Sequence, residues 1–133
     1  MPAELDPVDR LLLDELGEVP AGRVAVLGDD TGALATALVE HAGERVVAHC
    51  DSLVAERRVA RALVGAAVGG EAVPTLAEAL TDAALVVLRL PKSLDALDEI
   101  ARTATLLGTA DVRVVAGGRV KHMTPSMNDV LGA

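Results

Sequence analysis

Apolar residues follow two alternating patterns along this chain. Short continuous apolar runs predict buried strands at 24–27, 45–49, 72–75, 83–90 and 111–117. Stretches in which apolar residues return every three or four positions predict helices at 7–16, 31–41, 53–64, 76–80 and 93–107. Strands that are apolar on both faces and alternate with helices are typical of a parallel sheet covered on both sides. We therefore expect an α/β fold with a Rossmann-like, doubly wound, mostly parallel sheet and helices on both faces.

Residues that favour helix ends stand at the predicted boundaries. Asp6 and Pro7 form an N-cap and first-turn pair before the first helix. Ser93 is placed to cap the last helix, and Gly108 is placed to end it. We predict one domain over 1–133, and its first part, 1–21, forms a helix and a turn.

Length and composition narrow the class of protein. The chain has 133 residues, of which 51% are hydrophobic, enough for one globular core. No apolar run approaches the roughly 18 residues that a membrane span needs, and no secretory signal is visible. Cys50 is the single cysteine, so no internal disulfide can form, which suits a reducing compartment. We expect a cytoplasmic protein with no membrane partner.

Charge and aromatic content limit how the chain could hold a nucleic acid. The formal net charge of −8 argues against binding a phosphate backbone through bulk charge, although local basic groups could still contact RNA. The sequence contains no Phe, Tyr or Trp. An aromatic face usually contributes about 1–3 kcal/mol per stacked base, and no base would find such a face here.

The turn after the first strand has the framework of a cofactor site with altered chemistry. Gly28 and Gly32 would let a ligand approach the backbone at the start of the next helix. Asp29 and Asp30 would repel a phosphate, so the turn favours a ligand with an amine and a sulfonium, such as S-adenosylmethionine. The alternative is that Asp29, Asp30 or Thr31 caps the helix.

Asp51 is a second candidate for cofactor binding. It follows the second strand, where an acid can accept hydrogen bonds from a ribose diol. It could equally cap the helix that begins at Leu53, and Ser52 could do the same.

Basic residues gather at three places in this acidic chain. Arg89 and Lys92 follow the strand at 83–90, at the sheet edge where ligands of open parallel sheets bind. The second place is the final segment, with Arg119 and Lys121. The third is the outer face of the predicted helix at 53–64, with Arg57, Arg58 and Arg61. The first two groups could contact RNA or a partner, or simply be solvated.

The sequence lacks the motifs of several other kinds of functional site. The three histidines are scattered, and one cysteine does not make a zinc site. No nucleophile elbow or P-loop occurs. A phosphoacceptor receiver domain would need an acid after the third strand, whereas Asp51 follows the second.

Two stretches carry a family resemblance. LPKSLDALDEIARTATLL (90–107) and VRVVAGGRVKHMTPSMNDVLG (112–132) resemble the N-terminal half of the tandem-domain ribosomal RNA guanine-N2 methyltransferases. The resemblance covers most of the chain from Gly22 onward. It implies two copies of one methyltransferase fold, of which the C-terminal copy binds S-adenosylmethionine and carries an Asn-Pro-Pro-Phe type catalytic motif. It also implies that the N-terminal copy is degenerate, supports the catalytic copy and helps hold RNA.

The glycine motif of an active copy is only partly present. Val26 stands where the family's first motif wants an acid, and Asp30 replaces the middle glycine. Gly28 and Gly32 are kept, and Asp51 matches the acid that binds ribose. The resemblance therefore marks Gly28, Asp30, Gly32 and Asp51 as a vestigial cofactor site.

The catalytic motif of an active copy is lost. Arg89 matches the catalytic Asn, Leu90 matches the first Pro, and Lys92 matches the aromatic residue, while Pro91 is kept. The group that would orient the target amine is absent, as is the ring that would stack on its base. By the family's pattern, this copy does not catalyse methyl transfer.

These observations lead to one expectation and two alternatives. We expect a non-catalytic domain of an rRNA methyltransferase whose residues 119–133 form a linker toward a C-terminal catalytic domain. S-adenosylmethionine would then serve the parent enzyme, with none bound here, and Arg89, Lys92, Arg119 and Lys121 would contact RNA or the partner domain. One alternative is an autonomous S-adenosylmethionine-dependent enzyme with a small substrate. The other is a structural, nucleotide-binding α/β module.

Overall fold

The computed structural model describes residues 5–17, 19, 21–29, 31–42, 45–50, 52–64, 70–89 and 93–117. Strands and helices alternate along them, as the sequence predicts. The helices are α1 (Pro7–Leu16), α2 (Ala33–Ala42), α3 (Leu53–Val64), α4 (Leu76–Leu80) and α5 (Leu94–Leu107). The strands are β1 (Arg23–Leu27), β2 (Val46–His49), β3 (Glu71–Ala72), β4 (Ala83–Arg89) and β5 (Arg113–Gly117).

The five strands form one parallel sheet in the order β3-β2-β1-β4-β5. The central strand β1 pairs with β2 on one side and with β4 on the other, so that Val26 lies beside both Ala48 and Val87. The connections from β1 to β3 therefore run one way along the sheet, and the connection from β4 to β5 runs the other way. The predicted α/β fold is confirmed, and β1 and β4 flank its topological switch point.

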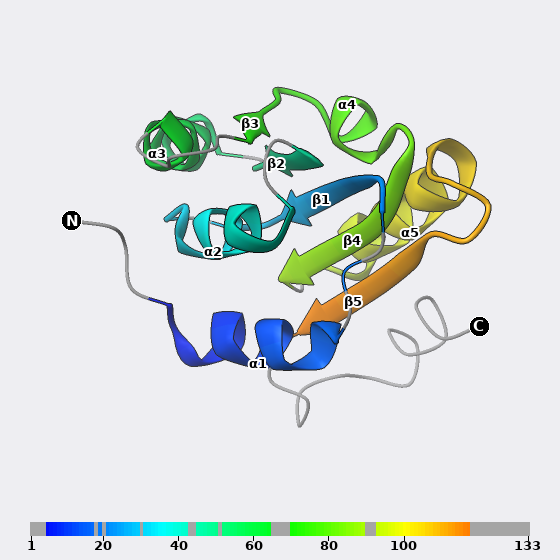
Figure 1. Ribbon diagram of the computed structural model, residues 1–133. Coiled ribbons are helices and arrows are strands. Elements are labelled where there is room, and N and C mark those ends of the chain that lie inside the picture. The colour runs from blue at the N-terminus through cyan, green and yellow to red at the C-terminus, as the bar shows by residue number, and fades with distance from the viewer. Residues whose placement is uncertain are drawn as a thin grey trace.

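Helices cover both faces of the sheet (Figure 1). Side chains of α1, α2 and α3 form one apolar cluster with one face of the strands, and side chains of α4 and α5 form a second cluster with the other face. Both clusters consist of aliphatic residues and small side chains, because the chain has no aromatic residue. The sheet is buried between two helical layers, which explains the continuous apolar runs of β1 and β4.

The third strand differs from its prediction. It covers Glu71–Ala72 rather than 72–75, and it pairs with β2. Pro74 has no N–H to donate, which limits pairing on its C-terminal side. On the other side, a Cβ at Gly70 would lie 2.4 Å from the carbonyl oxygen of Val46, so only glycine fits against β2. Tertiary packing therefore sets this strand, which the local sequence does not show.

The predicted capping residues of α1 and α5 are confirmed, whereas the helix predicted at 31–41 is α2 at Ala33–Ala42. The Asp6 carboxylate accepts a hydrogen bond from the Asp9 amide at 2.8 Å, and the Asp9 carboxylate accepts one from the Asp6 amide at 3.3 Å. This capping box begins α1. The Ser93 hydroxyl accepts a hydrogen bond from the Ala96 amide at 3.1 Å, and α5 ends at Gly108. In the described part of the chain, no helix has the length and apolar character that a membrane span requires.

Candidate functional site

The carboxyl ends of β1 and β4 meet at the switch point, where ligands of this fold class bind. Gly28 follows β1, and Arg89 is the last residue of β4. A Cβ at Gly28 would lie 3.1 Å from the Arg89 carbonyl oxygen. Gly28 has a φ of 82°, which few other residues adopt. The glycine therefore allows the two strand ends to approach closely.

Asp29 is buried at this edge and binds the start of α2. The residue is only 2% exposed. Oδ1 accepts hydrogen bonds from the amides of Thr31 at 3.3 Å and Gly32 at 3.1 Å, and Oδ2 accepts one from Ala35 at 2.9 Å. Of the two roles that the sequence left open for this acid, the structure shows helix capping.

The cap places a carboxylate where an anionic ligand would otherwise bind. Burial raises the pKa of Asp29, and the nearby charge of Asp9 adds to this effect, whereas the three amide hydrogen bonds oppose it. The N–H groups of a helix's first turn are the donors that hold a ligand phosphate in related folds. In this chain, Asp29 already binds the Ala35 amide of that turn and the Thr31 and Gly32 amides just before it.

Arg89 is held by the N-terminal helix. One guanidinium nitrogen, Nη1, lies 2.9 Å from Oδ1 of Asp6 and 2.7 Å from Oδ1 of Asp9. The Asp9 side chain is only 4% exposed, so this ion pair is shielded from water. The hydrogen bond from Arg89 lowers the pKa of Asp6. The capping box of α1 and the end of β4 thus form one charged network, in which every carboxylate oxygen that faces Arg89 has a donor.

Gly32 serves the packing of two helices. Its φ is 89°, and a Cβ at this position would lie 2.5 Å from the Cβ of Ala62 on α3. The backbone oxygen of Gly32 accepts the first hydrogen bond of α2, from Thr36 at 2.9 Å. The second glycine of the turn, Gly32, therefore has a structural reason that needs no ligand.

Several predicted site residues lie outside the described residues. These residues are Asp30, Asp51, Lys92, Arg119 and Lys121. Their predicted roles, and the cofactor roles of Gly28 and Gly32, stay predictions. Next to Asp51, the Ser52 hydroxyl accepts a hydrogen bond from the Ala55 amide at 3.3 Å, so Ser52 caps the start of α3.

Sequence reasoning missed Asp6 and Asp9 as partners of Arg89. Asp6 was predicted only as a helix cap, and Asp9 was given no role. Nothing in the order of residues links these acids to a strand that ends at position 89. One signal in the sequence was available. Arg89 ends a strand that is otherwise fully apolar, and a cation in that place indicates an acidic partner within the fold.

Comparison with known proteins assigns the family. The family model described as the RLMG N-terminal domain matches residues 5–133. The chain belongs to this family. This assignment confirms the resemblance seen in the sequence. The chain is therefore a parallel α/β domain related to rRNA methyltransferases.

The RLMG N-terminal domain occurs in longer relatives. The ribosomal RNA large subunit methyltransferase G of Pseudomonas syringae pv. tomato is 35% identical over 133 residues, which cover 95% of this chain and 35% of that protein. The homologous protein of Pseudomonas savastanoi pv. phaseolicola is also 35% identical over the same share of each chain. The chain therefore spans about a third of the length of the curated relatives it matches.

Solved structures support the fold of this RLMG N-terminal domain. Precorrin 8w decarboxylase of Methanobacterium thermoautotrophicum superposes with a TM-score of 0.70 at 23% identity, over 98% of this chain and 74% of that chain. A TehB-like SAM-dependent methyltransferase of Corynebacterium glutamicum superposes with a TM-score of 0.67 at 16% identity, over 92% and 69%. At these identities, the likeness concerns the fold alone.

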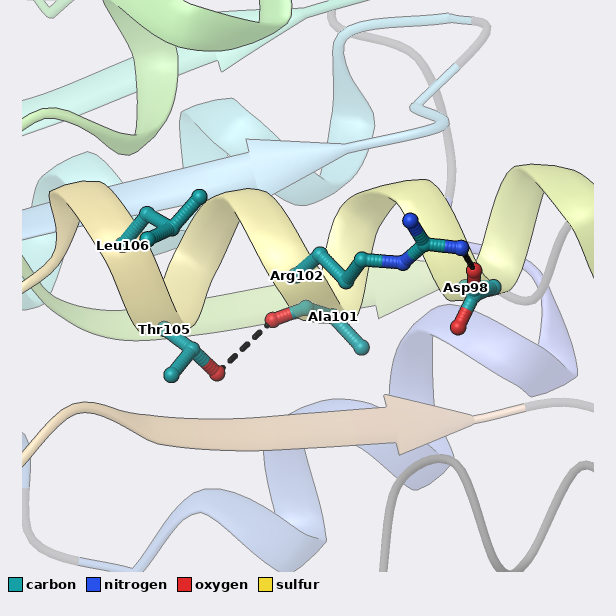
Figure 2. A pocket seen from close by; sticks show the side chains of 5 residues that line it. All are labelled: Asp98, Ala101, Arg102, Thr105 and Leu106. Carbon is teal, nitrogen blue, oxygen red and sulfur yellow. Dashed lines mark hydrogen bonds and ion pairs between the residues drawn. The ribbon is translucent and has the colours of Figure 1, made fainter.

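A hollow on α5 is separate from the switch point. It has a volume of about 410 Å³ and is lined by Asp98, Ala101, Arg102, Thr105 and Leu106. Figure 2 shows these side chains along one helix, with Arg102 paired to Asp98 and the Thr105 hydroxyl donating to the Ala101 carbonyl at 2.9 Å. The hollow is open, and its polar groups are bound within the helix. Among the described residues, no three His, Cys, Asp or Glu side chains are placed to hold a metal ion.

Replacing Asp29 with alanine in this RLMG N-terminal domain is expected to lower the free energy of unfolding by about 2 kcal/mol. The substitution leaves the amides of Thr31, Gly32 and Ala35 without their acceptor. Urea denaturation followed by circular dichroism measures the change. Asp29→Asn is the matched control, since it keeps one acceptor oxygen, and it should lose less. An unchanged Asp29→Ala protein would contradict the capping role.

Proposed function

We propose that this chain is a non-catalytic N-terminal domain of an rRNA methyltransferase and supports a C-terminal catalytic domain of the same chain. The family and the names of the longer relatives favour an rRNA methyltransferase as the parent protein. In that proposal, S-adenosylmethionine is the cofactor of the C-terminal domain, the linker covers 119–133, and the parent protein acts in the cytoplasm, where rRNA is modified.

The observation that carries the non-catalytic role is the closed charge network at the switch point. Arg89 stands at the end of β4, where the family's catalytic motif has an Asn, and its guanidinium binds Asp6 and Asp9. Asp29 occupies the amides at the start of α2. Arg89 and the amides of Thr31, Gly32 and Ala35 thus bind groups of the chain itself, which supports a non-catalytic role.

The main alternative is an autonomous S-adenosylmethionine-dependent enzyme with a small substrate. The retained glycines favour it, since Gly28 and Gly32 keep the positive φ values of a ligand-binding turn. Gly32, however, is also required for the contact between α2 and α3. Cofactor binding separates the two proposals.

The chain is expected to bind neither S-adenosylmethionine nor S-adenosylhomocysteine. A ligand amine would have to compete with Arg89 for the buried carboxylate of Asp9, and the amides of Gly32 and Ala35 at the start of α2 are already bound. Isothermal titration calorimetry with each ligand up to millimolar concentration measures this. Micromolar binding would support the autonomous enzyme and refute the non-catalytic role.

The supporting role needs a test on the parent protein. The full-length chain and a version without residues 1–133 can be compared by thermal unfolding and by methyl transfer to ribosomal RNA. We expect the shortened protein to be less stable and less active. Equal stability and activity of the two proteins would contradict the supporting role, whatever the calorimetry shows.

Contact with rRNA is a further part of the proposal. Lys92, Arg119 and Lys121 remain its predicted contacts. Arg89 would have to exchange two carboxylates for a phosphate, which disfavours it as an RNA contact.

A further inference from the structure

Most arginines that the structure describes bind groups of the chain itself. Their partners are backbone carbonyl oxygens or carboxylates. These internally bound arginines are Arg23, Arg45, Arg89, Arg102 and Arg113. Arg57, Arg58 and Arg61 of α3 differ from them. All three are exposed, and within the described ranges none has a hydrogen bond or an ion pair.

The three arginines share the outer face of α3. Arg57 and Arg61 are four positions apart, and Arg58 and Arg61 are three apart, so their side chains are neighbours on one helix surface. The side chains of α3 that face the core are Ala55, Val59 and Leu63. Glu56, the single acid of α3, is half-buried at the flank of the arginine face. Three cations therefore stand together within little more than one turn, with no acid between them on that face.

Exposed apolar side chains stand at both ends of this basic cluster. Leu53 and Val54 are each 59% exposed, and Val64 is 85% exposed. By the helical period, they fall on the same side of α3 as the arginines. We call the six residues Leu53, Val54, Arg57, Arg58, Arg61 and Val64 the α3 outer face. Large exposed apolar residues beside uncompensated cations are typical of a binding surface.

We propose that the α3 outer face binds rRNA, with the arginines on phosphates and unpaired bases. The choice of rRNA rests on the proposed function. A guanidinium matches a phosphate with two parallel hydrogen bonds, and its plane can stack on an unpaired base. That second property matters here, because the chain has no aromatic residue to supply a stacking face. The apolar ends of the surface would contact sugars and base edges.

The charge of the whole chain favours a local contact of this kind. With a net charge of −8, the protein as a whole repels a polyanion. Binding must therefore come from a surface where cations gather without acids, and α3 is the described element that offers one. An acidic protein segment would meet the same face, so the test includes it as a competitor.

Fluorescence anisotropy with a fluorescein-labelled single-stranded oligoribonucleotide of about 15 nucleotides tests the proposal on the 133-residue chain. The triple variant R57Q/R58Q/R61Q is expected to bind at least about tenfold more weakly than the original chain. Because each lost phosphate contact on a single strand removes about 0.7 from the slope of log affinity against log salt, the slope should fall by about 2.

Two matched variants give the controls. Arg10→Gln removes another exposed arginine, on α1, and should leave the affinity for RNA unchanged. The variant R57K/R58K/R61K keeps the charge but loses the planar group, and it should keep the salt slope while losing part of the affinity. All substituted side chains are exposed, so we expect the unfolding midpoints to stay the same.

Three results would overturn the proposal. They are no binding of the RNA by the original chain, equal binding by the triple glutamine variant, and displacement of the labelled RNA by polyglutamate as readily as by unlabelled RNA. The last result would assign the surface to an acidic protein. The calorimetry with S-adenosylmethionine and the thermal unfolding of the shortened parent protein do not measure RNA binding, so the failure of this inference and the failure of the proposed function are distinguishable.

Discussion

Replacing Arg89 with methionine is expected to lower the free energy of unfolding by about 3 kcal/mol. Methionine keeps much of the side chain's length but removes the cation that lies 2.7 Å from Asp9. The Asp9 side chain is 4% exposed, so its carboxylate would remain in the protein interior without a compensating charge. Urea denaturation followed by circular dichroism measures the loss.

A double-mutant cycle separates the ion pair from general effects of the substitution. Asp9→Asn removes the buried charge, and the double variant R89M/D9N should be more stable than R89M alone. Additive effects of the two substitutions would show that Arg89 and Asp9 do not interact. A loss below about 0.5 kcal/mol for R89M would contradict a structural role for the network.

The same network has a pH signature. The hydrogen bond from Arg89 holds the pKa of Asp6 below its ordinary value of 3.8. A carboxylate with a lowered folded-state pKa contributes stability that is complete above its unfolded pKa and is lost as the pH falls through the folded one. The difference in unfolding free energy between the original chain and R89M should therefore shrink on acidification below about 3.8. A difference that grows in acid would contradict this assignment.

Replacing Gly32 with alanine is expected to lower the free energy of unfolding by about 3 kcal/mol. The new Cβ would lie 2.5 Å from the Cβ of Ala62, and the φ of 89° is a conformation that alanine rarely adopts. Either α2 and α3 must separate, or the turn after β1 must change. Thermal or urea unfolding measures the effect.

Two variants divide this cost into its parts. Gly17→Ala adds a Cβ at a φ of 61° with no atom within 4 Å, so it measures backbone strain without a clash. Ala62→Gly, combined with Gly32→Ala, removes the clash and leaves the strain. We expect the double variant to recover the larger part of the loss. If Gly32→Ala costs no more than Gly17→Ala, the close contact between α2 and α3 is not what requires glycine.

The sequence predicts the elements of this fold well, because local patterns determine them. The helices at 53–64 and 76–80 have the predicted limits, and Asp6 and Ser93 cap helices as expected. These features depend on residues within a few positions of one another. The third strand was misplaced because its limits depend on Gly70 packing against Val46 of another strand.

The candidate site is less predictable, because burial and distant partners decide its chemistry. The sequence left Asp29 between capping and ligand binding, and its three amide partners show the capping role. Arg89 was predicted to meet an external anion, since its position at a strand end says nothing of α1. Its two carboxylate partners, Asp6 and Asp9, lie some 80 positions away in the sequence.

The contact between α1 and β5 has a consequence for how the protein is made. The first helix packs on the last described strand, and the Arg113 guanidinium donates a hydrogen bond to the Leu16 carbonyl at 2.8 Å. During synthesis, α1 leaves the ribosome before any of β5 exists. At roughly 5–20 residues per second, the delay is on the order of ten seconds. The apolar side of α1 must stay uncovered, or be held by a chaperone, during that time.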